Sequence, residues 1–202
     1  IGVAALLTNT TGASNTAVGR HALRLNTTGC RNTAVGMESL YSNTSGENNV
    51  AMGQSALEAN TTGDCNVGLG EKALDANTTA CYNTAIGAAA LSANTTGSAN
   101  VAVGYYSLYA TTTGTGNVAA GVQAGDSVTE GLDNTLIGDH AGHTVTTGDN
   151  NVIIGHNAGT DAVRTVTTGD SNIVIGNNSS ATAHIKIDWT VTSDLRDKTE
   201  IE

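Results

Sequence analysis

The chain has 202 residues, among them 25 Gly but no Pro or Phe, and aromatic residues make up only 3%. Its formal net charge of −10 disfavours binding to nucleic-acid phosphates. No apolar run approaches the roughly 20 residues of a transmembrane helix, so membrane insertion is not expected. A core of large aromatic side chains is excluded, and any core must be thin and built from small residues.

A 17-residue repeat organises the chain. Its best-formed unit reads N-T-A-V-G-x-x-A-L-x-x-N-T-T-G-x-x, and we number its positions 1 to 17 from the first Asn. One longer unit, of 21 residues, precedes the last Asn. The opening residues are Asn15, Asn32, Asn49, Asn66, Asn83, Asn100, Asn117, Asn134, Asn151 and Asn172. Ile1 and Gly2 fit positions 4 and 5, which predicts that the repeat extends upstream.

Positions 2 to 5 predict a short strand that ends in a bend. Position 5 is always Gly, from Gly19 to Gly176, and Gly adopts positive φ freely. Positions 2 and 4 fall on one face of the strand, and position 3 points the other way. Position 3 is Ala or Gly up to Ala119 and then becomes Leu136, Ile153 and Val174. This change predicts that the packing widens toward the C-terminal end.

The rest of the unit holds a second apolar segment and a turn. Positions 8 and 9 read Ala-Leu or Ser-Leu up to Leu108 and Ala-Gly from Gly125 onward, so the repeat changes subtype near Gly116. The second segment is compatible with either a strand or a short helical turn. The Asn-Thr-Thr-Gly block predicts a turn, because Asn bonds its own backbone and Gly supplies left-handed φ.

The expected fold is an all-β parallel β-solenoid of 17-residue coils. One unit cannot bury its own apolar face, whereas stacked units can, at roughly 4.8 Å per coil. Identical Asn and Thr side chains would form ladders along the rod. A coil this short and this poor in large side chains lacks burial, which predicts a homotrimer, intertwined or side by side, whose chains supply it for one another.

Residues 15–176 resemble the left-handed β-roll repeats of trimeric autotransporter adhesin heads, which carry a shorter N-S-V-A-I-G-type unit. We therefore assign 1–176 to a repetitive shaft. Residues 177–193 form a closing region in which Ala183 to Val191 alternates like a strand.

The segment from Thr192 to Ile201 resembles the S-D-x-R-x-K-x-x-I signature that opens the intramolecular chaperone of endosialidase-type phage tail proteins, with Asp197 where Leu is commoner. The resemblance implies that residues 194–202 are the start of a C-terminal chaperone segment. Members of that family cut themselves between Ser and Asp. The likeness implies that Ser193 is the nucleophile, Asp194 follows the scissile bond and Lys198 takes part in activation.

Together the two likenesses imply a receptor-binding fibre of a phage virion, extracellular, bound to other tail proteins and to a glycan or outer-membrane receptor of the bacterial surface. A bacterial trimeric surface adhesin head is the alternative. Apart from one self-cleavage, no enzyme activity and no cofactor are expected. A glycan-cutting tailspike would need paired carboxylates in a cleft, and the repeats leave no insertion to build one.

Few side chains interrupt the repeat. Tyr105, Tyr106 and Tyr109 form a candidate sugar-stacking patch, with a core or interface role as the alternative. Another cluster comprises His140, His143 and His156. Surface imidazoles are expected there, in preference to a metal site on a trimer axis.

Cys30, Cys65 and Cys81 are odd in number and lack zinc-ligand spacing. Cys65 and Cys81 fall in consecutive units, offset by one position, and are the candidate disulfide pair. Free thiols are the expected state.

Overall fold

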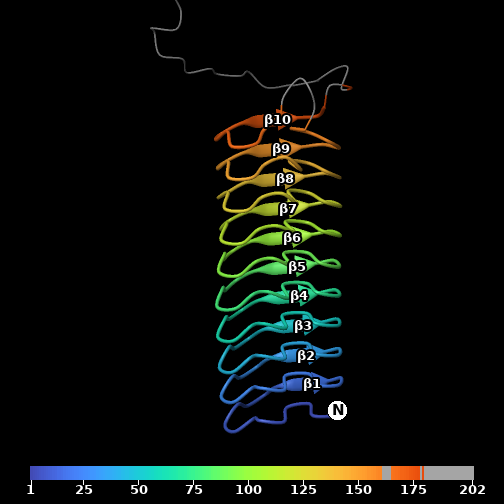
Figure 1. Cartoon of the computed structure of the whole chain (residues 1–202), viewed down its shortest axis with the longest axis vertical. Helices are drawn as coiled ribbons and strands as arrows, with labels where there is room; N and C mark the ends of the chain where they lie inside the picture. Colours follow the sequence, from blue (N-terminus) through green and yellow to red (C-terminus); the bar gives the residue numbers. More distant parts are fainter. Residues whose placement is uncertain (161–164, 178, 180–202) are drawn as a thin grey trace, which may run out of the picture.

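The computed structural model describes residues 1–160, 165–177 and 179. Ten parallel strands of three residues form one sheet in chain order, and their connections stack beside the sheet into a rod (Figure 1). The predicted all-β parallel β-solenoid is thus confirmed. The strands are β1 (Thr16–Val18), β2 (Thr33–Val35), β3 (Val50–Met52), β4 (Val67–Leu69), β5 (Thr84–Ile86), β6 (Val101–Val103), β7 (Val118–Ala120), β8 (Thr135–Ile137), β9 (Val152–Ile154) and β10 (Ile173–Ile175).

The register of the sheet follows the repeat without a slip. Every strand residue pairs with the residue at the same position in the next coil, as Thr84 pairs with Val101. The longer last coil keeps this register, since Ile173 pairs with Val152. Nine steps of about 4.8 Å give the sheet a length of ~43 Å.

Each strand ends at the Gly of position 5 because no side chain fits there. Gly70 has φ of +140°, and a Cβ on it would lie 2.5 Å from the carbonyl oxygen of Gly87 in the next coil. Both the backbone conformation and the close stacking therefore exclude other residues. The predicted bend is confirmed.

The segment after the bend is neither a strand nor a helical turn. It is a hydrogen-bonded turn in which positions 7 and 9 both adopt left-handed φ, as Lys72 (56°) and Leu74 (56°) do. The left-handed conformation costs about 1–2 kcal/mol for a leucine. Full burial of the same side chain contributes about 1.5–3 kcal/mol, so leucine is tolerated where Gly would be the unstrained choice.

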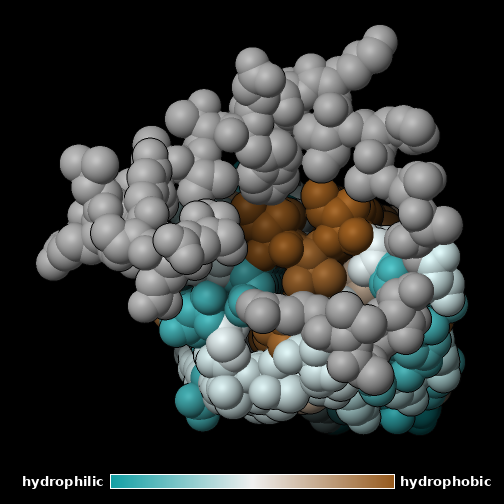
Figure 2. Space-filling view, turned by 90° about the horizontal axis from the view of Figure 1, so that it is seen from above, coloured by the Kyte–Doolittle hydropathy of each residue, from teal (hydrophilic) through white to brown (hydrophobic). Residues whose placement is uncertain are grey.

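The core lies inside each single chain. Position 3 points inward, and Ala85, Ala90 and Leu91 have no exposed surface. Seen from the β10 end, hydrophobic residues gather within the cross-section, with hydrophilic residues along the visible sides (Figure 2). The expectation that one chain lacks enough burial was wrong, because Leu at position 9 fills the space across from the small strand residue. The prediction of a homotrimer therefore needs support from a feature other than the core.

At the change of subtype, the large side chain of the core shifts from position 9 of the unit to position 3. Position 9 of one coil packs against position 3 of the next, as Leu57 contacts the site of a Cβ on Gly68. In the N-terminal half this pair is Leu with Ala or Gly. In the C-terminal half position 9 is Gly, and it lies against a large residue at position 3 of the next coil or of its own coil, as Gly142 lies against both Ile153 and Leu136. A Cβ on Gly125 would lie 2.4 Å from Cδ1 of Leu136. Large strand residues thus occupy the space that leucine vacates, and the predicted widening does not explain them.

The opening Asn residues form a buried ladder, as predicted. The backbone N–H of Asn83 donates to Oδ1 of Asn66 (3.0 Å), and its Nδ2 donates to the carbonyl of Gly97 (2.8 Å). Its Oδ1 accepts the backbone N–H of Asn100 (2.9 Å). Each buried amide therefore ties its own coil together and joins it to both neighbours.

A second Asn ladder, at position 12, stops partway along the rod. Nδ2 of Asn94 donates to Oδ1 of Asn77 (2.9 Å). The next two residues of this column are Thr111 and Val128, which cannot continue the amide chain. Oδ1 of Asn94 and Oγ1 of Thr111 are consequently buried without a hydrogen-bond partner.

This interruption predicts a stabilising substitution. Thr111→Val should raise the free energy of unfolding by about 1 kcal/mol, because it removes an unpaired buried hydroxyl at nearly constant volume. Urea denaturation followed by circular dichroism measures the change, and Thr113→Val, at an exposed site, is the control with little expected effect. A loss of stability in Thr111→Val would contradict the assignment of the orphaned hydroxyl.

Candidate functional site

Most of the Arg, Lys, His and Tyr side chains gather on one side of the rod. Among the described residues, every Arg, Lys, His and Tyr except Arg31 and Tyr82 lies at position 6, 7 or 10. We call this surface the variable face. Its Arg, Lys, His and Tyr residues are Arg20, His21, Arg24, Tyr41, Lys72, Tyr105, Tyr106, Tyr109, His140, His143 and His156. A concentration of such side chains on one side of a repetitive scaffold is typical of a binding surface.

The outer side of the sheet lacks the charged and aromatic side chains of the variable face. Positions 2 and 4 carry no charge in any coil, and four of these twenty residues are Thr while the rest are apolar. We call this surface the sheet face. It is substantially exposed: Ile86 is 40% exposed, Ile137 41% and Ile175 69%.

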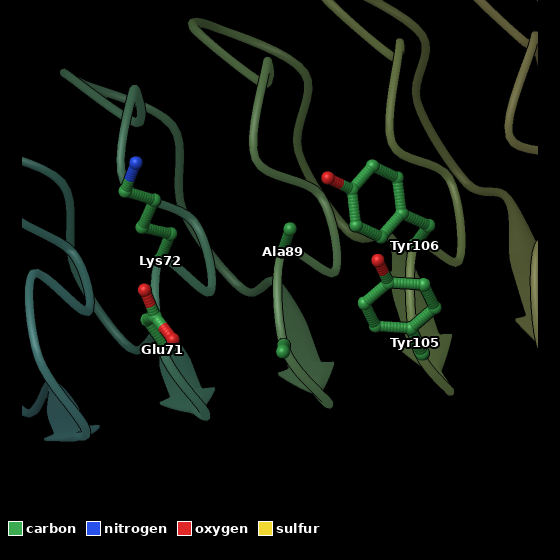
Figure 3. Close-up of a pocket in the computed structure, with 6 residues that line it drawn as sticks. Glu71, Lys72, Ala89, Tyr105 and Tyr106 are labelled. Atoms are coloured by element: carbon green, nitrogen blue, oxygen red, sulfur yellow. The ribbon is translucent and has the colours of Figure 1, made fainter.

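A groove crosses the variable face between the coils of Asn66 and Asn100 (Figure 3). Glu71 and Lys72 form one wall, and Tyr105 and Tyr106 form the other. The floor is the pair Ala88 and Ala89, whose side chains end at Cβ. The groove is open to solvent on one side and has a volume of about 220 Å³.

Backbone hydrogen bonds fix the spacing of the groove. The N–H of position 7 donates to the carbonyl of position 6 in the preceding coil, from Ala89 to Glu71 (2.8 Å) and from Tyr106 to Ala88 (3.1 Å). The two walls are therefore two coil steps apart, about 9.6 Å between backbones. The width is set by the sheet pitch and does not depend on a flexible loop.

The structure brings the three predicted tyrosines together. The ring centroids of Tyr105 and Tyr106 lie 4.3 Å apart, and those of Tyr106 and Tyr109 lie 4.5 Å apart in a stacked arrangement. Tyr105 is 53% exposed and Tyr109 39%. A side-chain hydrogen bond with Tyr106 favours the protonated form of Tyr105 and raises its pKa above the ordinary tyrosine value. The cluster is thus an aromatic surface outside the core.

The three C-terminal imidazoles pair with carboxylates. Nδ1 of His143 lies 2.5 Å from Oδ1 of Asp126. Asp139 lies between two imidazoles, 3.0 Å from Nδ1 of His140 and 2.9 Å from Nδ1 of His156. No group of three or more His, Cys, Asp or Glu within the described residues is arranged to hold a metal ion.

A second cluster occupies the N-terminal end of the variable face. Nη1 of Arg24 donates to the hydroxyl of Tyr41 (2.7 Å), and the Tyr41 ring meets His21 edge-on at 6.0 Å. Glu38 lies 3.4 Å from the guanidinium of Arg20. The residues of this cluster other than Arg20 are half-buried, and the buried Nε of Arg24 has no hydrogen-bond partner.

All three cysteines are free thiols, as expected. Cys81 occupies position 16, where its Sγ accepts the backbone N–H of Asp64 (3.2 Å). Oγ of Ser98 and Oδ1 of Asp149 accept the equivalent bond from the backbone N–H of position 16 in the preceding coil. Cys81 is therefore one of several small acceptors in this column, and Cys65 lies in the neighbouring column at position 17.

Other predicted site residues lie outside the described residues. They are the closing strand and the self-cleavage residues Ser193, Asp194 and Lys198. Within the part of the chain that the structure describes, no helix is long and apolar enough to cross a bilayer. No protein-family model, curated protein or solved structure matches this chain.

Proposed function

We propose that this chain is the shaft of a homotrimeric attachment fibre, in which three rods associate through their sheet faces and present their variable faces outward. One observation carries the proposal: the sheet face is uncharged, largely apolar and continuous over ten strands. Extended exposed apolar surfaces of this kind mark sites of association. The face also repeats itself in every coil, so a second copy of the chain matches it at every step.

The opposite character of the two faces supports this arrangement. Association through positions 2 and 4 covers the apolar surface and leaves positions 6, 7 and 10 in contact with solvent. The number of chains follows from the likeness of the repeat to trimeric adhesin heads. The net charge of −10 on each chain keeps assembled fibres apart in solution.

Within this class of fibre, a phage tail fibre is the first candidate and a bacterial surface adhesin head the second. The likeness of residues 192–201 to the chaperone signature of phage tail proteins favours the first. Mass spectrometry of the full-length gene product separates the two. A cut after Ser193 supports the phage fibre, and an intact product that continues into a coiled-coil stalk supports the adhesin.

Charge on the sheet face should dissociate the fibre. We expect the double variant Ile86→Lys and Ile137→Lys to sediment as single chains, because association would bury six ammonium groups per trimer against apolar surface. Analytical ultracentrifugation measures the mass, and circular dichroism checks that the solenoid remains folded.

The matched control is the double variant Gln54→Lys and Val122→Lys, which places the same charge on the variable face, where both residues are exposed. This variant should remain trimeric. A sheet-face variant that keeps the mass of the unmodified protein would contradict association through this face.

A further inference from the structure

We propose that the groove between Glu71–Lys72 and Tyr105–Tyr106 binds one pyranose ring of a neutral glycan. This inference rests on the proposed attachment function and names the ligand class and the site. The groove differs from the rest of the variable face in joining an aromatic wall, a floor of two alanines and a wall of two charged groups.

The aromatic wall suits the apolar side of a sugar ring. A pyranose presents C–H groups on one side and hydroxyls around its edge, so it can lie against a tyrosine ring while its edge remains polar. Tyr105 is exposed, and Tyr106 is held by Tyr109 in a stacked pair. Aromatic side chains with few rotatable bonds give contact area at low entropic cost.

The opposite wall supplies hydrogen-bonding groups for the edge of the ring. The Glu71 carboxylate accepts hydrogen bonds, and the Lys72 ammonium donates them. Neither side chain forms an ion pair or a hydrogen bond with another described residue, so both remain available to a ligand. The Tyr106 hydroxyl points toward this wall across Ala89 (Figure 3). Sugar hydroxyls, which both donate and accept, match this mixed set.

Charge selects neutral sugars over acidic ones. The groove carries one carboxylate and one ammonium, which leaves no net positive charge to hold an anion. The whole chain carries a net charge of −10, which repels polyanionic polysaccharides. A neutral sugar ring needs no net positive charge in the groove and is not repelled by the net charge of the chain.

The repeat itself provides substitutions that preserve the fold. Positions 6 and 7 are Glu-Lys, Ala-Ala and Tyr-Tyr in three consecutive coils. Position 7 has nearly the same φ in all three, 56° at Lys72, 54° at Ala89 and 56° at Tyr106. Any of these pairs can therefore replace another without new backbone strain.

The test uses the full chain and saturation-transfer NMR with maltose, lactose, mannobiose and N,N′-diacetylchitobiose as probes, and alginate as an anionic contrast. At least one neutral disaccharide should bind. Binding should fall at least about tenfold when the aromatic wall is removed by Tyr105→Ala with Tyr106→Ala. It should fall equally when the floor is filled by Ala88→Glu with Ala89→Lys.

The control is Tyr82→Ala, which removes a 67% exposed tyrosine outside the groove at a position where Ala99 occurs naturally. This variant should bind like the unmodified protein. Failure of all four disaccharides, binding of alginate alone, or unchanged binding in both groove variants would overturn the proposal. Light scattering on the same samples reports oligomeric mass, so loss of sugar binding in an intact trimer is distinguished from failure of the fibre proposal.

Discussion

Gly125→Leu should destabilise the rod by about 3 kcal/mol, and adding Leu136→Ala to the same chain should recover most of that loss. The single variant forces a side chain into space already filled by Leu136, whose Cδ1 would lie 2.4 Å from the new Cβ. Leu136→Ala alone should cost about 2–5 kcal/mol through the cavity it leaves. The double variant recreates the pairing of Leu108 with Ala119 found one coil earlier.

Urea denaturation of the four proteins in this cycle measures the coupling between the two sites. The control cycle pairs Leu136→Ala with Leu57→Gly, which lies five coils away, and these effects should add. If the effects of Gly125→Leu and Leu136→Ala also added, that result would contradict the conclusion that these two positions share one space in the core.

Asn83→Ala should lower the free energy of unfolding by about 1–3 kcal/mol, the cost of one unpaired buried group. The substitution leaves the backbone N–H of Asn100 buried without its side-chain partner. The carbonyl of Gly97 loses the bond from Asn83 but keeps the one that Nδ2 of Asn94 donates (3.0 Å). Hydrogen exchange should quicken most in the coils of Asn83 and Asn100, since these lose the bonds directly.

The control for this variant is Asn150→Ala. Asn150 is exposed at position 17 with φ of 56°, and Ala99 occupies the same position with φ of 59°. Little change is expected. If both substitutions destabilised the rod equally, the ladder would not be the source of the effect.

Features that repeat could be predicted from the sequence, since the same residue at the same position in ten units indicates its structural role more clearly than a single residue does. The Gly of position 5 fixed the strand ends, and the Asn of position 1 indicated the ladder. The conformation of position 9 could not be predicted, because a leucine such as Leu57 with φ of 52° contradicts its own backbone preference and is held there by burial.

Features that link different coils were harder to predict. Leu57 and Gly68 are eleven residues apart, and nothing in the unit indicates that position 9 lies against position 3 of the next coil. The tyrosines of the groove were recognised by their rarity. Glu71 and Lys72 were missed because the opposite wall comes from two units away, and Ala89 was missed because its contribution is a short side chain. Comparing successive units at fixed positions 6 and 7 would have found all of them.

Light scattering combined with small-angle X-ray scattering on the full chain tests the fibre most directly. We expect a particle of about 60 kDa, three times the 20.2 kDa of one chain, with the length of a single rod and a thicker cross-section. A particle of single-chain mass at micromolar concentration, or a trimer three times as long, would contradict side-by-side association through the sheet face.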